Sequence, residues 1–286
     1  MKEKNNIIDK IVFESNGGSI FSLCVHKGEL FSGSYDSICK WNSKGECIGV
    51  LQKHTDWVNC ICVHNGFIYS GSYDKTIVKW DDSGNCICVL KGHTSGVWCL
   101  ISFKGYLFSG SSDNTIIRWN SEGKIDLIIK GHSSAVTCLC ILNDQLISGS
   151  WDKTIKIWDV NGNCKITLEG HTDWIYCLCV WRDTLFSSSG DKSIIKWNDS
   201  SISQQLNQHT STIKSLVVFN DHLWSVSYDN VMIEWDWNCN VIRKCQHKLL
   251  LSSSCLTVFD NMIFSGHNDG SIIGWIGLLF IYIVEF

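Results

Sequence analysis

Residues 54–90 have the sequence HTDWVNCICVHNGFIYSGSYDKTIVKWDDSGNCICVL, which divides into four short apolar or alternating runs separated by turn residues. Runs of this length and composition predict β-strands. Asn65-Gly66 lies between two of the runs, and this dipeptide favours a two-residue hairpin because both residues tolerate positive φ. Lys27-Gly28 and Lys104-Gly105 occupy the same place in the neighbouring stretches. The stretch therefore predicts four short strands joined by tight turns.

The same pattern recurs along the 286 residues, with a tryptophan near the end of each unit at spacings of 39, 39, 39, 39, 38 and 40 residues. An Asp precedes each Trp, a Ser lies four residues before each Asp, and a His lies further upstream in six units. The tryptophans are Trp41, Trp80, Trp119, Trp158, Trp197, Trp235 and Trp275. The aspartates are Asp36, Asp74, Asp113, Asp152, Asp191, Asp229 and Asp269. The serines are Ser32, Ser70, Ser109, Ser148, Ser187, Ser225 and Ser265, and the histidines are His54, His93, His132, His171, His209 and His247. Self-similarity at this period indicates a repeat architecture.

A ring follows from the burial of the repeated sheets. One small sheet cannot bury both of its faces, whereas sheets stacked face to face bury them, and a closed ring leaves no terminal sheet exposed. The sequence thus predicts an all-β fold, with one domain over residues 1–286 rather than two.

The pairs Gly92-His93, Gly131-His132 and Gly170-His171, together with Trp80-Asp81, Trp158-Asp159 and Trp235-Asp236, resemble the paired signatures of the WD-repeat family. The resemblance implies a seven-bladed β-propeller with one four-stranded blade per repeat. It also implies that the first strand of the chain completes the last blade, and residues 8–13 align with residues 47–52 for that part. The units are similar to the propellers of F-box proteins, ring-type ubiquitin ligases and amoebal kinases.

Two departures from the pattern flank the expected closure. Unit 1 lacks the His and is one residue short between Asp36 and Trp41, and unit 7 has two extra residues between His247 and Ser265. We therefore expect the seam to be the least regular part of the ring. The apolar tail, residues 276–286, is too short for a membrane span. We expect it to pack at the seam, while a docking segment or an altered gene end remain alternatives.

The His, Ser and Asp of each unit could suggest a catalytic triad, but an enzyme needs one such set and this chain has six. The resemblance implies instead that His, Ser, Asp and Trp form a buried hydrogen-bond chain in each of units 2 to 7, with every polar group satisfied. No unrepeated cluster of carboxylates, His or a nucleophile supports an enzyme, so a propeller hydrolase is the weakest alternative.

Composition limits the classes of partner, the metal sites and the cell compartment that we expect. The net charge of −4 comes without long runs of one sign, which argues against nucleic-acid and membrane partners. The sixteen cysteines follow the repeat, as in Cys60/Cys62 and Cys138/Cys140, and lack the C-x-x-C spacing of zinc sites. We interpret them as small buried side chains between blades. The first residues do not resemble a signal peptide. We expect a cytoplasmic protein without metal or cofactor, although the nucleus fits the same composition.

The resemblance places partners on the face that carries the turns before the first strand and between the second and third strands of each blade, here called the top face. Three positions per unit line it, and nine of these 21 are aromatic, where the chain average of 12% would give two or three. They are Tyr35, Tyr73, Trp151, Tyr228, Trp57, Trp174, Phe21, Trp98 and Tyr176. Aromatic clusters on a rigid frame are typical of binding hot spots, although some, above all Trp57 and Trp174, could merely cap the blades beneath them.

The charges at and near these positions limit the class of ligand that we expect. Only Lys214 among them is basic, which disfavours a phosphopeptide, since such ligands need converging arginines. Asp56 and Asp173 lie near the aromatic positions and favour a peptide with an apolar, Arg or Lys anchor. We therefore expect a scaffold or adaptor that binds peptides or subunits, including substrates of a separate ubiquitin ligase or kinase. A structural subunit of a larger stable complex is the alternative.

Overall fold

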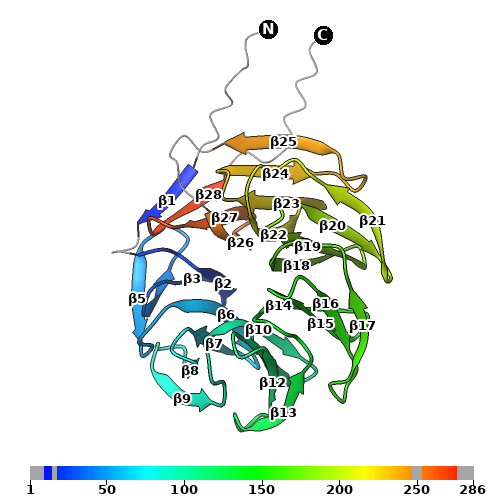
Figure 1. The fold of residues 1–286 in the computed structure, drawn as a ribbon. Coiled ribbons are helices and arrows are strands. Elements are labelled where there is room, and N and C mark those ends of the chain that lie inside the picture. Colours follow the sequence, from blue (N-terminus) through cyan, green and yellow to red (C-terminus); the bar gives the residue numbers. More distant parts are fainter. Residues whose placement is uncertain (1–9, 15–17, 247–252, 276–286) are drawn as a thin grey trace.

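The computed structural model describes residues 10–14, 18–246 and 253–275 of the chain. Within these ranges every regular element is a β-strand, and the strands form seven four-stranded antiparallel sheets arranged as the blades of a propeller (Figure 1). The described residues include no helix of the length and hydropathy that a membrane crossing would require.

Blades 1 to 6 each take four consecutive strands, in the order in which they occur in the chain. Blade 1 comprises β2 (Ser22–His26), β3 (Glu29–Gly33), β4 (Ser37–Trp41) and β5 (Cys47–Gln52). Blade 2 comprises β6 (Val58–His64), β7 (Phe67–Ser72), β8 (Thr76–Trp80) and β9 (Cys86–Lys91). Blade 3 comprises β10 (Val97–Phe103), β11 (Tyr106–Ser111), β12 (Thr115–Trp119) and β13 (Ile125–Lys130). Blade 4 comprises β14 (Val136–Leu142), β15 (Gln145–Ser150), β16 (Ile155–Trp158) and β17 (Cys164–Leu168).

Blade 5 comprises β18 (Ile175–Trp181), β19 (Thr184–Ser189), β20 (Ile194–Asn198) and β21 (Ser201–Leu206). Blade 6 comprises β22 (Ile213–Phe219), β23 (His222–Ser227), β24 (Val231–Trp235) and β25 (Val241–Gln246). Blade 7 combines β26 (Ser253–Phe259), β27 (Met262–His267) and β28 (Ser271–Trp275) with β1 (Lys10–Glu14). The first strands of neighbouring blades contact one another around the centre, and the fourth strands lie at the rim (Figure 1).

The N-terminal strand closes the ring, as the resemblance implied. β1 pairs antiparallel with β28, and the two lie side by side in Figure 1 although they come from opposite ends of the chain. The register corrects the alignment by one residue. In blade 1, Gln52 opposes Ser37. The counterpart of Ser37 in blade 7 is Ser271, and Glu14 opposes it, whereas the alignment predicts residue 13 at this place. The difference arises because the register is fixed by the hydrogen bonds to β28 and not by the sequence of an isolated apolar run.

The predicted hairpins between the first and second strands are confirmed. Asn65 has a φ of 48° and Gly66 a φ of 78°, the left-handed pair that a type I′ turn requires. The same pair of positive φ values recurs in every blade, at Lys27-Gly28, Lys104-Gly105, Asn143-Asp144, Arg182-Asp183, Asn220-Asp221 and Asp260-Asn261. These tight turns point away from the top face, so they leave it to the longer connections.

The core lies between blades. One cluster joins Phe31 and Ile38 of blade 1 to Ile61 and Trp80 of blade 2, and similar clusters fill the other described interfaces. At Gly71 the neighbouring blade comes so close that a Cβ would lie 2.6 Å from the Cγ1 of Val97.

All sixteen cysteines lie within the described ranges and are free, and Cys99, Cys138, Cys140, Cys239 and Cys245 are buried. No group of three or more His, Cys, Asp or Glu side chains in the described structure is placed to hold a metal ion.

Candidate functional site

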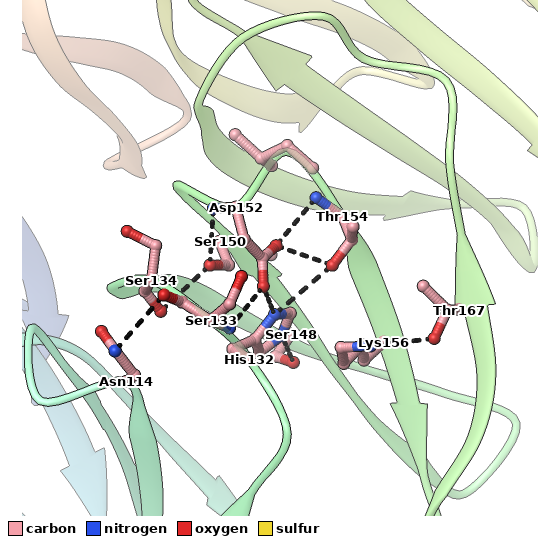
Figure 2. A network of polar contacts seen from close by, with 12 residues as sticks. Asn114, His132, Ser133, Ser134, Ser148, Ser150, Asp152, Thr154, Lys156 and Thr167 are labelled. Atoms are coloured by element: carbon pink, nitrogen blue, oxygen red, sulfur yellow. Dashed lines mark hydrogen bonds and ion pairs between the residues drawn. The ribbon is translucent and has the colours of Figure 1, made fainter.

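The repeated polar residues of blade 4 form one connected network (Figure 2). His132 Nδ1 lies 2.7 Å from Asp152 Oδ2, and His132 Nε2 lies 2.7 Å from Ser148 Oγ. Trp158 Nε1 donates to the same serine oxygen over 2.8 Å. Because a carboxylate only accepts, Nδ1 donates to Asp152, and in the neutral ring Nε2 accepts from Ser148. Thr154, which the repeat analysis missed, donates its backbone N and its hydroxyl to Asp152 Oδ1 over 2.9 and 2.6 Å.

Four other blades contain the same set with almost the same distances. The sets are His54, Ser70, Asp74 and Trp80 in blade 2; His93, Ser109, Asp113 and Trp119 in blade 3; His171, Ser187, Asp191 and Trp197 in blade 5; and His209, Ser225, Asp229 and Trp235 in blade 6. The threonine corresponds to Thr76 and Thr115 in blades 2 and 3, to Ser193 in blade 5, and to Val231, which offers only its backbone N, in blade 6.

The electrostatics of these sets favour charged carboxylates. Burial by itself would raise the pKa of the Asp74 carboxyl, but the hydrogen bonds from His54 and Thr76 outweigh it and hold the pKa well below its usual range. In blades 3 to 6 burial likewise opposes the charged form, and the hydrogen bond from the histidine of each set outweighs it together with neighbouring donors, so the pKa of each corresponding aspartate is lowered. Asp74 is therefore an acceptor that the fold needs in its ionised form.

Burial also decides whether the sets can perform chemistry. The five serines are fully buried, at 0% exposure, and each serine oxygen already contacts a histidine and a tryptophan. A nucleophile must reach its substrate, and these oxygens do not. The sets instead tie the turn before the first strand to the second and third strands, and so fix the connections that make up the top face.

The two blades beside the closure depart from the pattern. In blade 1, Trp41 Nε1 still donates to Ser32 Oγ over 2.8 Å, but Asp36 is exposed and makes no such contacts with the described residues. In blade 7, Trp275 Nε1 donates to Ser265 Oγ, and the histidine beside this serine is His267, whose Nε2 lies 2.8 Å from the oxygen. The expected partner His247, the insertion at residues 247–252 and the tail at residues 276–286 lie outside the described residues.

The place of His267 in the repeat distinguishes unit 7 from units 2 to 6. It occupies the position held by Ser72, Ser111, Ser150, Ser189 and Ser227 in blades 2 to 6, two residues before the aspartate. Asp269 itself accepts hydrogen bonds from the backbone N and hydroxyl of Ser271. In unit 7 the ring of His267, which replaces a small serine, therefore reaches the oxygen of Ser265 from within the same strand. The part of His247 in this set stays a prediction, because His247 lies outside the described residues.

On the top face, eight of the nine aromatic residues form one curved surface, which we call the aromatic arc: Phe21, Trp57, Tyr73, Trp98, Trp151, Trp174, Tyr176 and Tyr228. It begins in blade 1, where Phe21 stacks on Trp57 at 5.3 Å between ring centroids. Trp57 lies 5.7 Å from Tyr73, and Tyr73 meets the edge of Trp98 in blade 3 at 6.3 Å. These spacings are those of interacting aromatic pairs.

The arc continues through blades 4 and 5. Trp98 lies 5.3 Å from Trp151, which stacks on Trp174 at 4.4 Å, and Trp174 lies 6.4 Å from Tyr176. Trp98 Nε1 donates to Ser112 Oγ, whereas Trp151 Nε1 is buried and has no hydrogen-bond partner among the described residues.

The end of the arc is joined by Lys214 of blade 6, whose Nζ lies 3.6 Å from the ring centroid of Tyr176 and 5.4 Å from that of Tyr228. Tyr35, the ninth aromatic residue, makes no ring contact in the described structure. Lys214 therefore links two tyrosines that no aromatic contact joins.

Exposure separates two groups within the nine. Tyr35, Tyr73, Trp174, Trp57 and Tyr228 are 56%, 43%, 42%, 39% and 38% exposed, while the other four are half-buried. Trp57 and Trp174 thus cap neighbouring rings and still present surface to solvent. Asp56 Oδ1 and Asp173 Oδ1 accept the backbone N–H of the following tryptophan, each over 2.8 Å. One negative charge therefore lies next to each of these two rings.

Comparison with known proteins agrees with this geometry. The family model described as WD domain, G-beta repeat matches residues 45–81, 84–120, 123–159 and 162–198, just over half of the chain. A search of curated proteins finds no match. Among solved structures, the WD40 β-propeller domain of Doa1 is similar, with a TM-score of 0.84 and 20% identity over 93% of this chain and 95% of that one. At that identity the likeness concerns the fold alone.

Proposed function

The chain belongs to the WD-repeat family, whose members are generally non-enzymatic scaffolds for protein interactions, and on that premise we propose that it binds a peptide or subunit of another protein through the aromatic arc. The observation that carries the proposal is the continuity of the arc across blades 1 to 6. Aromatic side chains held by a rigid frame lose little entropy on binding and supply most of the energy of many interfaces.

The charges beside the arc support a selective surface. Asp56 and Asp173 would repel an acidic stretch laid over Trp57 or Trp174, and would attract an Arg or Lys that stacks on those rings. A single lysine does not supply the converging cations that a phosphate group requires. We therefore propose apolar or basic anchors along most of the arc, and an adaptor role that includes substrate recognition for a separate ubiquitin ligase or kinase.

The sixteen free thiols also support a reducing compartment. We propose that the protein acts in the cytoplasm, with the nucleus fitting the same chemistry.

Affinity capture from native cells tests the proposal. The wild type is compared with the Tyr73→Ala/Trp174→Ala double variant and with Phe67→Ala, which removes an exposed aromatic ring from a hairpin turn on the opposite face. We expect a small set of proteins to be captured by the wild type and by Phe67→Ala, and to be lost with the double variant while its melting temperature stays close to that of the wild type. Equal capture by all three forms would show that the interface lies outside the arc.

One observation favours the alternative of a structural subunit. The fourth strands of blades 1 to 4 carry exposed apolar side chains, among them Ile48, Val50, Ile87 and Ile128. Surface of this kind on the rim suits a large permanent interface. Size-exclusion chromatography of the native protein decides between the two: a stable assembly that survives loss of the arc, and dissociates in Ile48→Ser/Val50→Ser, would favour the subunit.

A further inference from the structure

Lys214 is a cation without a counter-ion in the described structure. Its side chain is half-buried, and its Nζ faces the rings of Tyr176 and Tyr228. No hydrogen bond or ion pair joins it to another described residue. Aromatic rings stabilise an ammonium in part, but they do not replace the hydrogen bonds that it loses on leaving water.

Among the described residues, the titratable groups that face Lys214 directly are Tyr176, Tyr228 and Cys255, and all three are uncharged at neutral pH. Burial raises the pKa of Tyr176 and of the Cys255 thiol to about 12 each, and it also raises the pKa of Tyr228. The charged group of the neighbouring blade is Asp173, which acts on Tyr176. Burial lowers the pKa of Lys214 to about 8, so the amine is still mainly protonated at pH 7. None of the described groups in direct contact with Lys214 therefore supplies a negative charge to its ammonium.

The place of Lys214 in the arc limits what the anion can be. On one side the aromatic surface continues through Tyr176 and Trp174. On the other side blade 7 offers polar groups, with Ser254 Oγ donating to Asn268 Oδ1 over 2.7 Å. Among the described residues, the ring contacts of the arc thus end at the cation, which suits a ligand chain that also ends there.

We infer that Lys214 binds the C-terminal carboxylate of a peptide whose last side chains are apolar or aromatic and lie on Tyr176, Trp174 and Trp151. One carboxylate matches one ammonium, whereas a phosphate dianion would remain undercompensated. This inference rests on the proposed function, since it assigns a ligand group to the Lys214 end of the aromatic arc.

Fluorescence polarisation with the peptide fluoresceinyl-Gly-Ala-Leu-Phe, made as the free acid and as the C-terminal amide, tests the inference. We expect the acid to bind the wild type at least tenfold more tightly than the amide. Lys214→Met, which keeps an unbranched side chain one atom shorter and without charge, should abolish the difference, and Lys214→Arg should retain most of it. Lys192→Met, on an exposed turn of the top face, is the matched control and should behave as the wild type.

The pH dependence provides a second readout that a merely structural lysine would not change. The preference for the acid should decline as the pH rises above 8, because Lys214 of the free protein loses its proton there. In Lys214→Arg the preference should persist to higher pH.

Three results would overturn the inference. Equal binding of acid and amide, both lost in Trp174→Ala, would leave the peptide-binding arc intact but remove the role of Lys214. Equal binding by an amidated peptide with an internal glutamate would assign the lysine to an acidic side chain instead of a chain end. Absence of binding by the free acid at millimolar concentration would also refute it, while the capture experiment decides separately on the arc.

Discussion

Replacing Asp152 by alanine tests the claim that the repeated polar sets hold the blades together. The carboxylate accepts from His132 Nδ1, from the backbone N of Ser133, and from both the backbone N and the hydroxyl of Thr154 (Figure 2). Ser133 is exposed, so water can replace the acceptor of its N–H. The His132 side chain is only 1% exposed and loses its partner outright.

The magnitude follows from the donors left without an acceptor. Each buried unsatisfied donor costs about 1–3 kcal/mol, and the variant leaves the His132 ring and the two donors of Thr154 without their acceptor. We therefore expect Asp152→Ala to lower the free energy of unfolding by about 3–5 kcal/mol. For a chain of this size the melting temperature should fall by about 6–15 °C.

Asp36 provides the matched control, because it holds the same place in unit 1 but is exposed and joins no such network among the residues that the structure describes. Asp36→Ala should change the free energy of unfolding by less than about 0.5 kcal/mol, as surface substitutions usually do. Urea unfolding followed by tryptophan fluorescence measures both variants, with the slope checked for a common transition. If the two variants lost the same stability, or if Asp152→Ala lost less than about 1 kcal/mol, the networks would not hold the fold.

Three further predictions concern other parts of the fold. Gly71→Ala should destabilise the protein by about 1–3 kcal/mol by forcing blades 2 and 3 apart, and Gly49→Ala, where an added Cβ meets only ordinary contacts, should not; equal urea midpoints would contradict the close approach. The aspartates of the sets have lowered pKa values, so their contribution to the free energy of unfolding is complete above the unfolded pKa of about 4 and is lost as the pH falls further. Between pH 5 and 2 the free energy of unfolding should therefore decline less steeply in Asp152→Ala than in the wild type. Parallel curves would contradict this role of the carboxylate. Maleimide should label the exposed Cys47, Cys88 and Cys164 of the native protein quickly, and mass spectrometry should find Cys99 and Cys138 modified only after unfolding, because burial raises their pKa values and blocks access; labelling of Cys99 at the rate of Cys47 would show an open blade interface.

The sequence alone determined the all-β ring, its seven units, and the type of turn at Asn65-Gly66. These features depend on contacts within one repeat, where the spacing of His, Ser, Asp and Trp is fixed by the length of the strands between them. A local pattern that recurs seven times is a strong signal, because each copy predicts the same structure independently.

Only the tertiary structure decided what happens where units meet. The register of β1 on β28 depends on the closure of the ring, which joins distant parts of the chain. The sequence also marked the aromatic positions of the top face, but Trp98 and Trp151 come into contact only because consecutive blades bring residues far apart in the chain side by side. The packing of Lys214 against Tyr176 and Tyr228 has the same origin. The shape of the ring sets such contacts, and no fixed spacing in the sequence predicts them.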